Sequence, residues 1–369
     1  MTAILAPFAL LAALARPAAP DEGFVELTVP AKPDATTLLL TSDAPASVVE
    51  TRAVSLVRGT NRLRFDWSRE RVDEGSVRFD VQPAAGTAEI AARTKIHRLG
   101  GMLYFDVEAS EDTAATLATR YLLYGVGWRV DYVGLLPSEG APDALALRLD
   151  VEVTNNAGKD LEDARVRFEG GEIDHLSLRP GERRQVEVFR LEGVPVIRRY
   201  LWDPARFGGT PAIQLEIENA PGGPIARELL PAGKIRIFAA RAEGGPALLG
   251  EDVFPATPLG EKAKLATGNA RDLVVERIVL QVGNENERRD RWNKVVAYDQ
   301  RAKVRFKVRN GFSHDTTLTL FETPGAPLEI VSCSAPYERK KADAIEIQAA
   351  LPAGQETIVE IEWLRKNLF

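Results

Sequence analysis

The sequence predicts an all-β protein made of two or three consecutive antiparallel β-sandwich domains of the immunoglobulin-like type. Three observations lead to this prediction: apolar and polar residues alternate along many short segments, turn-forming residues separate the segments, and helical periodicity is nearly absent. Alternation with a period of two puts apolar side chains on one face of a strand and polar side chains on the other. A sheet with one polar face is wet on that side, which favours antiparallel pairing.

The alternating segments run through most of the chain. In residues 145–153, leucine and valine side chains alternate with Arg148, Asp150 and Glu152, and the same pattern occurs in 62–67, 164–168, 213–217, 302–309 and 359–363. Turn signals separate them at 155–158, 180–181, 221–223 and 353–354, where Gly, Pro and Asn allow tight reversals. The best candidate for a helix is the short segment 111–121.

The length of 369 residues suggests two or three domains, because domains usually contain roughly 100–200 residues. We assign residues 1–19 to a signal peptide, 20–118 to an N-terminal β domain, 119–270 to a central β-sandwich domain and 271–369 to a C-terminal immunoglobulin-like β-sandwich domain.

A weak internal repeat supports modular sandwiches. Each copy has an alternating strand that ends in an asparagine, Asn155 or Asn310, followed by a partner strand. Each copy closes with the pattern Leu-x-x-Gly-Glu/Gln-x-x-x-Val-Glu-Val/Ile, beginning at Leu178 and at Leu351. An asparagine at the exit of a strand caps the following turn through its side chain, so we expect the two asparagines to have the same structural role.

Residues 3–15 form an apolar run that is followed by small residues at Ala18 and Ala19. The run is shorter than the roughly 20 residues that a membrane-spanning helix needs, and it fits a secretory signal peptide, although no Lys or Arg precedes it. The alternative is a buried N-terminal helix. The signal peptide predicts an exported protein of the periplasm or cell envelope of a bacterium, and because no later segment is a transmembrane candidate, we expect the mature protein to be soluble.

The composition excludes several classes of function. A net charge of -6 argues against nucleic-acid binding, which needs a concentrated basic face. Cys333 is the single cysteine, so no intrachain disulfide can form, and the three histidines lie far apart in the sequence. Zinc motifs and nucleotide-binding glycine patterns are absent. We therefore predict no catalytic residue, no metal site and no cofactor.

Exposed aromatic residues are candidate platforms for sugar ligands, because sugars stack on exposed rings. Tyr200 and Trp202 precede Pro204 and the pair Gly208-Gly209, which predicts a loop with an aromatic tip, and we take these two residues as the candidate ligand-binding residues. Trp128 and Tyr132 have strand spacing and face the same side, which is more typical of a core. On that interpretation Trp128→Ala is expected to cost about 3–5 kcal/mol.

Several segments resemble an uncharacterised bacterial domain shared with the mucoidy-inhibitor-A-like proteins. The similar segments are Glu50-Thr51-Arg52, Gly59-Thr60-Asn61, Ser76-Val77, the Trp128–Tyr132 strand, the hairpin 147–168 and the segments 229–240 and 248–268. The resemblance covers about residues 47–365, and the coiled-coil arm of the mucoidy-inhibitor-type members is missing. The resemblance implies export without an established enzymatic activity, and it supplies no catalytic residue.

These observations predict a non-catalytic exported envelope protein that binds a protein partner or a surface polysaccharide. A hydrolase of envelope glycans is the alternative, because its two carboxylates need no sequence motif. A structural spacer between modules is a third interpretation. An enzyme should show acids that converge in a cleft, whereas a binding protein should show a flat or aromatic-rimmed patch.

Overall fold

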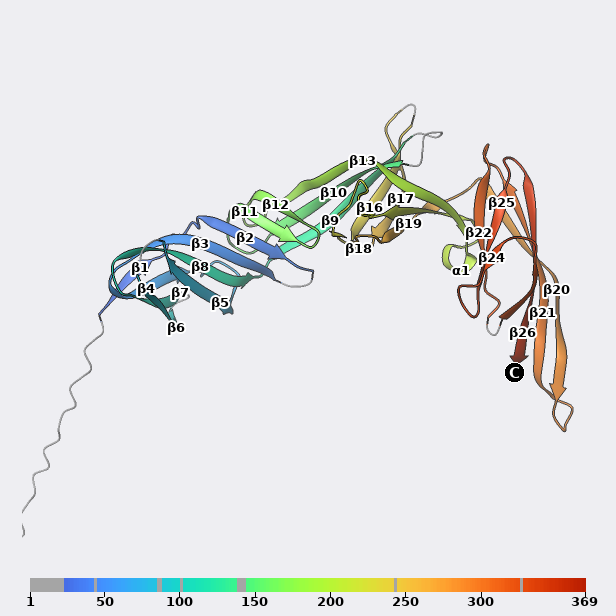
Figure 1. Cartoon of the computed structure of the whole chain (residues 1–369), viewed down its shortest axis with the longest axis horizontal. Coiled ribbons are helices and arrows are strands. Elements are labelled where there is room, and N and C mark those ends of the chain that lie inside the picture. The colour runs from blue at the N-terminus through green and yellow to red at the C-terminus, as the bar shows by residue number, and fades with distance from the viewer. Residues whose placement is uncertain are drawn as a thin grey trace, which may run out of the picture.

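A computed structural model of the chain describes residues 23–42, 45–84, 88–99, 102–137, 144–241, 244–325 and 328–369. The predicted signal peptide, residues 1–19, lies outside these residues. The one helix among the described residues is α1 (Pro204–Phe207), and nearly all the rest is strand, so the predicted all-β class is confirmed. None of the described helical structure is long and apolar enough to cross a membrane. Figure 1 shows an elongated row of packed sheets.

The first sandwich lies at the N-terminal end of this row (Figure 1). One of its sheets has the order β1 (Phe24–Thr28), β4 (Gly59–Asp66), β7 (Met102–Ala109) and β6 (Ile90–Leu99). The other has the order β12 (Gly171–Leu178), β11 (Leu161–Phe168), β2 (Ala35–Leu40), β3 (Ala46–Leu56), β8 (Thr113–Leu123) and β5 (Val72–Pro83). The rings of Phe79 on β5 and Phe105 on β7 lie 4.4 Å apart, which joins the two layers.

The second sandwich packs its main sheet against β11 and β12. That sheet contains β17 (Ala247–Phe254), β16 (Gly233–Ala239), β9 (Val126–Leu136), β10 (Ala144–Asn155) and β13 (Arg183–Trp202), with β14 (Ala212–Glu218) and β19 (Lys262–Asn269) attached beside β13. The rings of Trp128 on β9 and Phe168 on β11 lie 5.4 Å apart across the layers. A short ladder joins β15 (Leu229–Leu230) to β18 (Thr257–Pro258).

The third sandwich lies at the C-terminal end. One sheet has the order β20 (Leu273–Arg289), β21 (Val295–Asn310), β26 (Glu356–Leu368) and β23 (Leu328–Cys333). The opposite layer consists of the end of β13, followed by β22 (Thr316–Glu322), β25 (Ile345–Leu351) and β24 (Tyr337–Glu338). Trp202 meets Phe306 edge to face at 5.7 Å between these layers.

Some strand pairs are parallel, although the sequence predicted antiparallel sheets, and two of these parallel pairs join neighbouring sandwiches. Most pairs are antiparallel, but β1–β4, β2–β11, β9–β16 and β13–β22 are parallel. The β2–β11 pair joins the first sandwich to the second, and β13 continues from the second into the third, as Figure 1 shows. One hydrophobic core therefore runs through the first two sandwiches, from Val29 to Leu265, and another fills the third, from Tyr200 to Trp363.

The segment 111–121 is not a helix, and that expectation is wrong. It forms most of β8, in which Ala115, Leu117, Thr119, Tyr121 and Leu123 are buried at every second position. The alanine-rich composition favours a helix in isolation, but β8 pairs on both edges, with β3 and β5. Tertiary pairing and burial on a pleated surface outweigh local propensity here.

Asn155 caps the turn after β10, as predicted. Its side chain is completely buried, and its amide nitrogen donates to the carbonyl oxygens of Lys159 at 2.7 Å and Leu178 at 3.1 Å. Its amide oxygen accepts from the backbone N–H of Ala157 at 3.1 Å.

Asn310 makes the same contacts at the end of β21. It is also fully buried; its amide nitrogen donates to the carbonyl oxygens of His314 at 3.1 Å and Leu351 at 3.0 Å. Its amide oxygen accepts from the backbone N–H of Phe312 at 2.9 Å. In both copies the strand before the asparagine pairs with the closing strand, β10 with β13 and β21 with β26. The internal repeat is therefore a repeat of topology and of hydrogen bonding.

A buried ionic cluster fastens the β10–β11 turn to the first sandwich. The cluster consists of Glu50, Arg52, Glu70 and Lys159, whose side chains are 0%, 3%, 16% and 7% exposed. The Lys159 ammonium lies 3.2 Å from carboxylate oxygens of both Glu50 and Glu70, and Arg52 meets Glu50 at 2.8 Å. Burial raises the pKa of Glu70, and the charge of Lys159 acts in the opposite direction.

The backbone around Lys159 fits this arrangement closely. Gly158 has a φ of 77°, and a Cβ at this position would collide with the carbonyl oxygen of Arg69. The Arg71 N–H donates to the Ala157 carbonyl oxygen at 2.9 Å. Only glycine allows both this left-handed conformation and this close approach without strain, so the turn inserts Lys159 between two carboxylates of the first sandwich.

Candidate functional site

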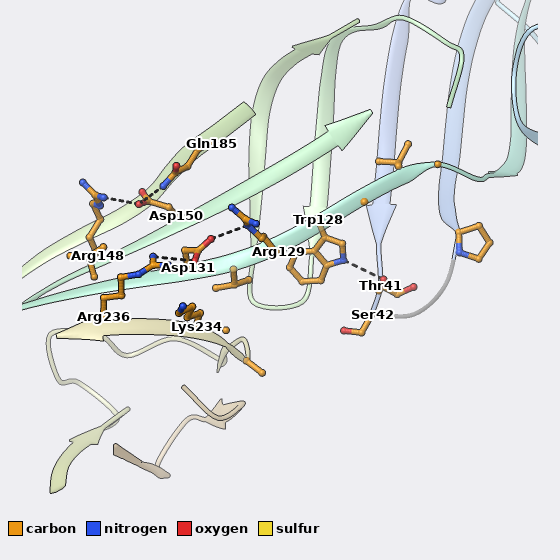
Figure 2. Close-up of a pocket in the computed structure, with 18 of the residues that line it drawn as sticks. Thr41, Ser42, Trp128, Arg129, Asp131, Arg148, Asp150, Gln185, Lys234 and Arg236 are labelled. Atoms are coloured by element: carbon orange, nitrogen blue, oxygen red, sulfur yellow. Dashed lines mark hydrogen bonds and ion pairs between the residues drawn. The ribbon is translucent and has the colours of Figure 1, made fainter. Parts of the chain in front are cut away.

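A groove with a volume of about 990 Å³ lies beside the first half of β9. We call it the β9 groove. Its walls come from segments far apart in the sequence: the loop after β2, both faces of the start of β9, and residues of β10, β13 and β16. Figure 2 shows Trp128 near Thr41 at one end and a row of charged side chains along the β9–β10 face.

The first half of β9 has an open edge in this groove. β9 pairs with β10 from Val126 to Leu135, but its pairing with β16 on the other side begins at Asp131 and Lys234. Val126–Val130 therefore has a strand neighbour on one side only, as far as the described residues extend. β16 begins at Gly233, and a Cβ at this glycine would lie 2.6 Å from the carbonyl oxygen of Val130.

Trp128 lies at the boundary between the core and the groove. Val130 and Tyr132, on the same strand face, are buried as predicted, at 5% and 0% exposure. Trp128 itself is half-buried: it packs against the core and Phe168 and also lines the groove. Its indole N–H donates to the carbonyl oxygen of Thr41 at 3.2 Å. The prediction of a core face is right for two residues and only partly right for the tryptophan.

A network of ion pairs on β9, β10 and β16 forms one wall of the groove, which we call the charged wall. Asp131 and Asp150 are directly opposite each other on β9 and β10, an arrangement that is unfavourable unless cations lie nearby. Arg148 lies 2.9 Å from Asp150. Arg129 and Arg236 lie 3.2 Å and 3.7 Å from Asp131. Arginine side chains thus hold the two carboxylates in their facing positions.

The solvent side of this wall is basic. The side chains of Arg129 and Lys234 are 63% and 49% exposed, whereas those of Asp131 and Asp150 are 15% and 4% exposed. Four basic side chains and two carboxylates line the groove. The carboxylates Glu152 and Glu251, which pair with Arg129 and Lys234, lie outside the lining. Among the residues that line the groove, the basic side chains are therefore more exposed than the carboxylates, although the chain as a whole has a net charge of -6.

Tyr200 and Trp202, the ligand-binding candidates from the sequence, are not on a loop, so that expectation is wrong. They are the last residues of β13 and are 6% and 5% exposed. The indole N–H of Trp202 donates to the carbonyl oxygen of Gly209 at 3.0 Å, and Tyr200 lies against Phe312. The turn begins only after Trp202, because pairing with β14 and β22 keeps these residues in the sheet. Buried rings offer no face for stacking.

The described residues contain no group of three or more His, Cys, Asp or Glu side chains that could hold a metal ion. The groove residues were not found from the sequence, because the alternating pattern identified only one polar face of each strand. The register that places Asp131 opposite Asp150, and both near β16, depends on long-range pairing.

Comparison of the chain with protein-family models and with curated protein sequences finds no match. The function of the groove is therefore inferred from its geometry and charge.

Trp128→Ala is expected to lower the free energy of unfolding by about 1–3 kcal/mol, less than for a fully buried tryptophan, because part of the ring already contacts solvent. Thermal unfolding of the variant and the parent tests this. Trp292, which is 71% exposed, provides the control, and Trp292→Ala should leave the midpoint nearly unchanged. Equal shifts for the two variants would contradict a structural role of Trp128.

Proposed function

We propose that this chain is an exported bacterial envelope protein that binds an extended anionic polymer, a protein segment or a polysaccharide, in the β9 groove. The observation that carries the proposal is the arrangement of charge: the basic side chains that line the groove are more exposed than the carboxylates, which lie close to the sheet. The groove follows the open edge of β9 and has the half-buried ring of Trp128 at one end, an arrangement that suits a linear ligand lying along the strand.

Export and family membership belong to the same proposal. The apolar run at residues 3–15 and the small residues after it support export. The resemblance to the domain shared with the mucoidy-inhibitor-A-like proteins rests on the order of its motifs in the sequence. Two of those motifs have defined roles in the fold, since Glu50 and Arg52 belong to the ionic cluster and Trp128 lines the groove.

A glycan hydrolase is less well supported by the same site. Asp131 and Asp150 face each other, as two catalytic carboxylates would. A hydrolase needs one of its two carboxyl groups to carry a proton as the general acid. Each of these carboxylates instead forms an ion pair with a guanidinium group. This arrangement is typical of an ion-pair lattice in a binding surface.

Titration with defined polymers tests the proposal. We expect the protein to bind polyglutamate or polygalacturonate at low ionic strength and not to bind neutral dextran, with affinity falling as salt screens the charges. The double variant Arg129→Glu/Lys234→Glu should lose at least about tenfold in affinity, which corresponds to about 1.4 kcal/mol.

The matched control is Lys262→Glu/Lys307→Glu, which makes the same change in net charge at exposed lysines on β19 and β21. It should bind like the parent. If neither anionic polymer binds, or if the two double variants lose affinity equally, the β9 groove is not the binding surface.

A further inference from the structure

We infer that the occupant of the β9 groove is a polypeptide segment with alternating acidic and apolar residues, which adds to the open edge of β9 as a β-strand. This inference rests on the proposed function and specifies its ligand. Strand addition to a sheet edge uses main-chain hydrogen bonds for affinity and alternate side chains for specificity.

The register of β9 shows which backbone groups point into the groove. Asn155 lies opposite Val126, and its N–H donates to the carbonyl oxygen of Glu182, on the side away from β9. Val126 and Asn155 are therefore a non-hydrogen-bonded pair of the antiparallel ladder, and the N–H and C=O of Val126 point outward. The direction of the backbone N–H and C=O groups alternates along a strand with a period of two, so the N–H and C=O of Trp128 also point outward.

Val130 is the next residue of β9 whose backbone N–H and C=O point outward, and it lies where a partner strand is present. Its carbonyl oxygen lies against Gly233, where β16 begins to pair with β9. No hydrogen-bond partner occurs among the described residues for the outward N–H and C=O groups of Val126 and Trp128. Unpaired strand edges are templates for another strand, and a strand placed here would continue the line of β16.

The length and the two faces of the edge define the sequence that fits. Val126–Val130 spans roughly 17 Å at about 3.3 Å per residue, enough for a segment of about five residues. Side chains of an added strand lie next to those of β9 on each face. On one face that neighbour is Trp128, and on the other it is Arg129, followed by Lys234. Apolar and acidic residues in alternation match both faces at once.

A polysaccharide would match the charge but not the backbone. Uronic acid units can pair with arginine and lysine, but they carry no peptide N–H and C=O groups at the spacing of a β-ladder. The open edge therefore favours a polypeptide, and polysaccharide binding becomes the alternative outcome of the test.

The probe is an eight-residue peptide of alternating valine and glutamate, with a valine–lysine peptide as the charge control and polygalacturonate as the polysaccharide. Val126→Pro removes an N–H that points into the groove and is not used by β10, a position where an edge strand tolerates proline. Val126→Ala keeps this N–H and shortens the side chain. We expect Val126→Pro to weaken binding of the glutamate peptide at least about tenfold, and Val126→Ala to retain most of the affinity.

Hydrogen exchange gives a second readout that does not depend on the folding of the proline variant. In the parent protein, the glutamate peptide should slow exchange of the amides of Val126 and Trp128. If polygalacturonate binds, the peptide does not, and these amides exchange unchanged, the inference is overturned and the proposed function stands. If no anionic probe binds, both fail. Peptide binding that resists Val126→Pro and leaves the amides unprotected also overturns strand addition.

Discussion

Lys159→Met is expected to lower the free energy of unfolding by about 3–5 kcal/mol, the usual effect of removing one partner from a buried ion pair. Methionine fills a similar volume, but the substitution leaves the Glu70 carboxylate without its cation, and Glu50 with Arg52 alone. The tip of the β10–β11 turn would then insert an apolar side chain between the buried carboxylate of Glu50 and the partly buried carboxylate of Glu70. Denaturant titration of the variant beside the parent measures the loss.

Two further variants separate the buried charge from the loss of a lysine in general. Lys262, which pairs with Glu218 while both are about half exposed, provides the control, and Lys262→Met should cost less than about 1 kcal/mol. Adding Glu70→Gln to Lys159→Met should recover part of the loss, because burial already disfavours the charge of Glu70. A loss for Lys159→Met no larger than the control would show that the ionic cluster does not hold the first two sandwiches together.

Asn310→Ala is expected to destabilise the third sandwich by about 1–3 kcal/mol for each buried carbonyl group left without a donor. The buried carbonyl oxygen of Leu351 loses this donor, as do the partly buried carbonyl oxygens of His314 and Pro352, and the N–H of Phe312 loses its acceptor. Alanine at this position cannot replace any of these hydrogen bonds. Because β21 and β25 meet at this turn, the thermal midpoint of the third sandwich should fall.

The exposed Asn284 on β20 provides the comparison, and Asn284→Ala should change the free energy of unfolding by no more than about 0.5 kcal/mol. Asn155→Ala, at the equivalent place in the second sandwich, should behave like Asn310→Ala. Unequal effects at these two positions would contradict the equivalence of the repeat.

The sequence predicted the parts of the fold that depend on period-two alternation and on local turns. Segments such as 145–153 became strands with the expected buried faces, and Asn155 and Asn310 cap their turns. The segment 111–121 was missed, because its alternating face includes Ala115 and Thr119, which are weakly apolar and give no strong strand signal.

Long-range features could not be predicted. Lys159 belongs to the polar turn of a hairpin in the sequence, and its burial depends on Glu50 and Glu70, which come from another sandwich. The parallel pairs β2–β11 and β13–β22 join strands that are distant along the chain. The open edge of β9 could not be predicted from the local sequence either, because it exists only since β16 begins to pair with β9 at Lys234 and not earlier.

Site-directed photo-crosslinking from Gly127 in cells that produce the protein tests the central claim, that a partner occupies the β9 groove. A Cβ at Gly127 meets no atom within 4 Å, so the side chain of a photoreactive phenylalanine analogue would leave the backbone into open space. The same analogue at Gly283 on β20, which is also open, provides the control. We expect a discrete protein adduct from position 127 that is absent from position 283 and is lost in the Arg129→Glu/Lys234→Glu background. No adduct from position 127, or the same adducts from both positions, would contradict it.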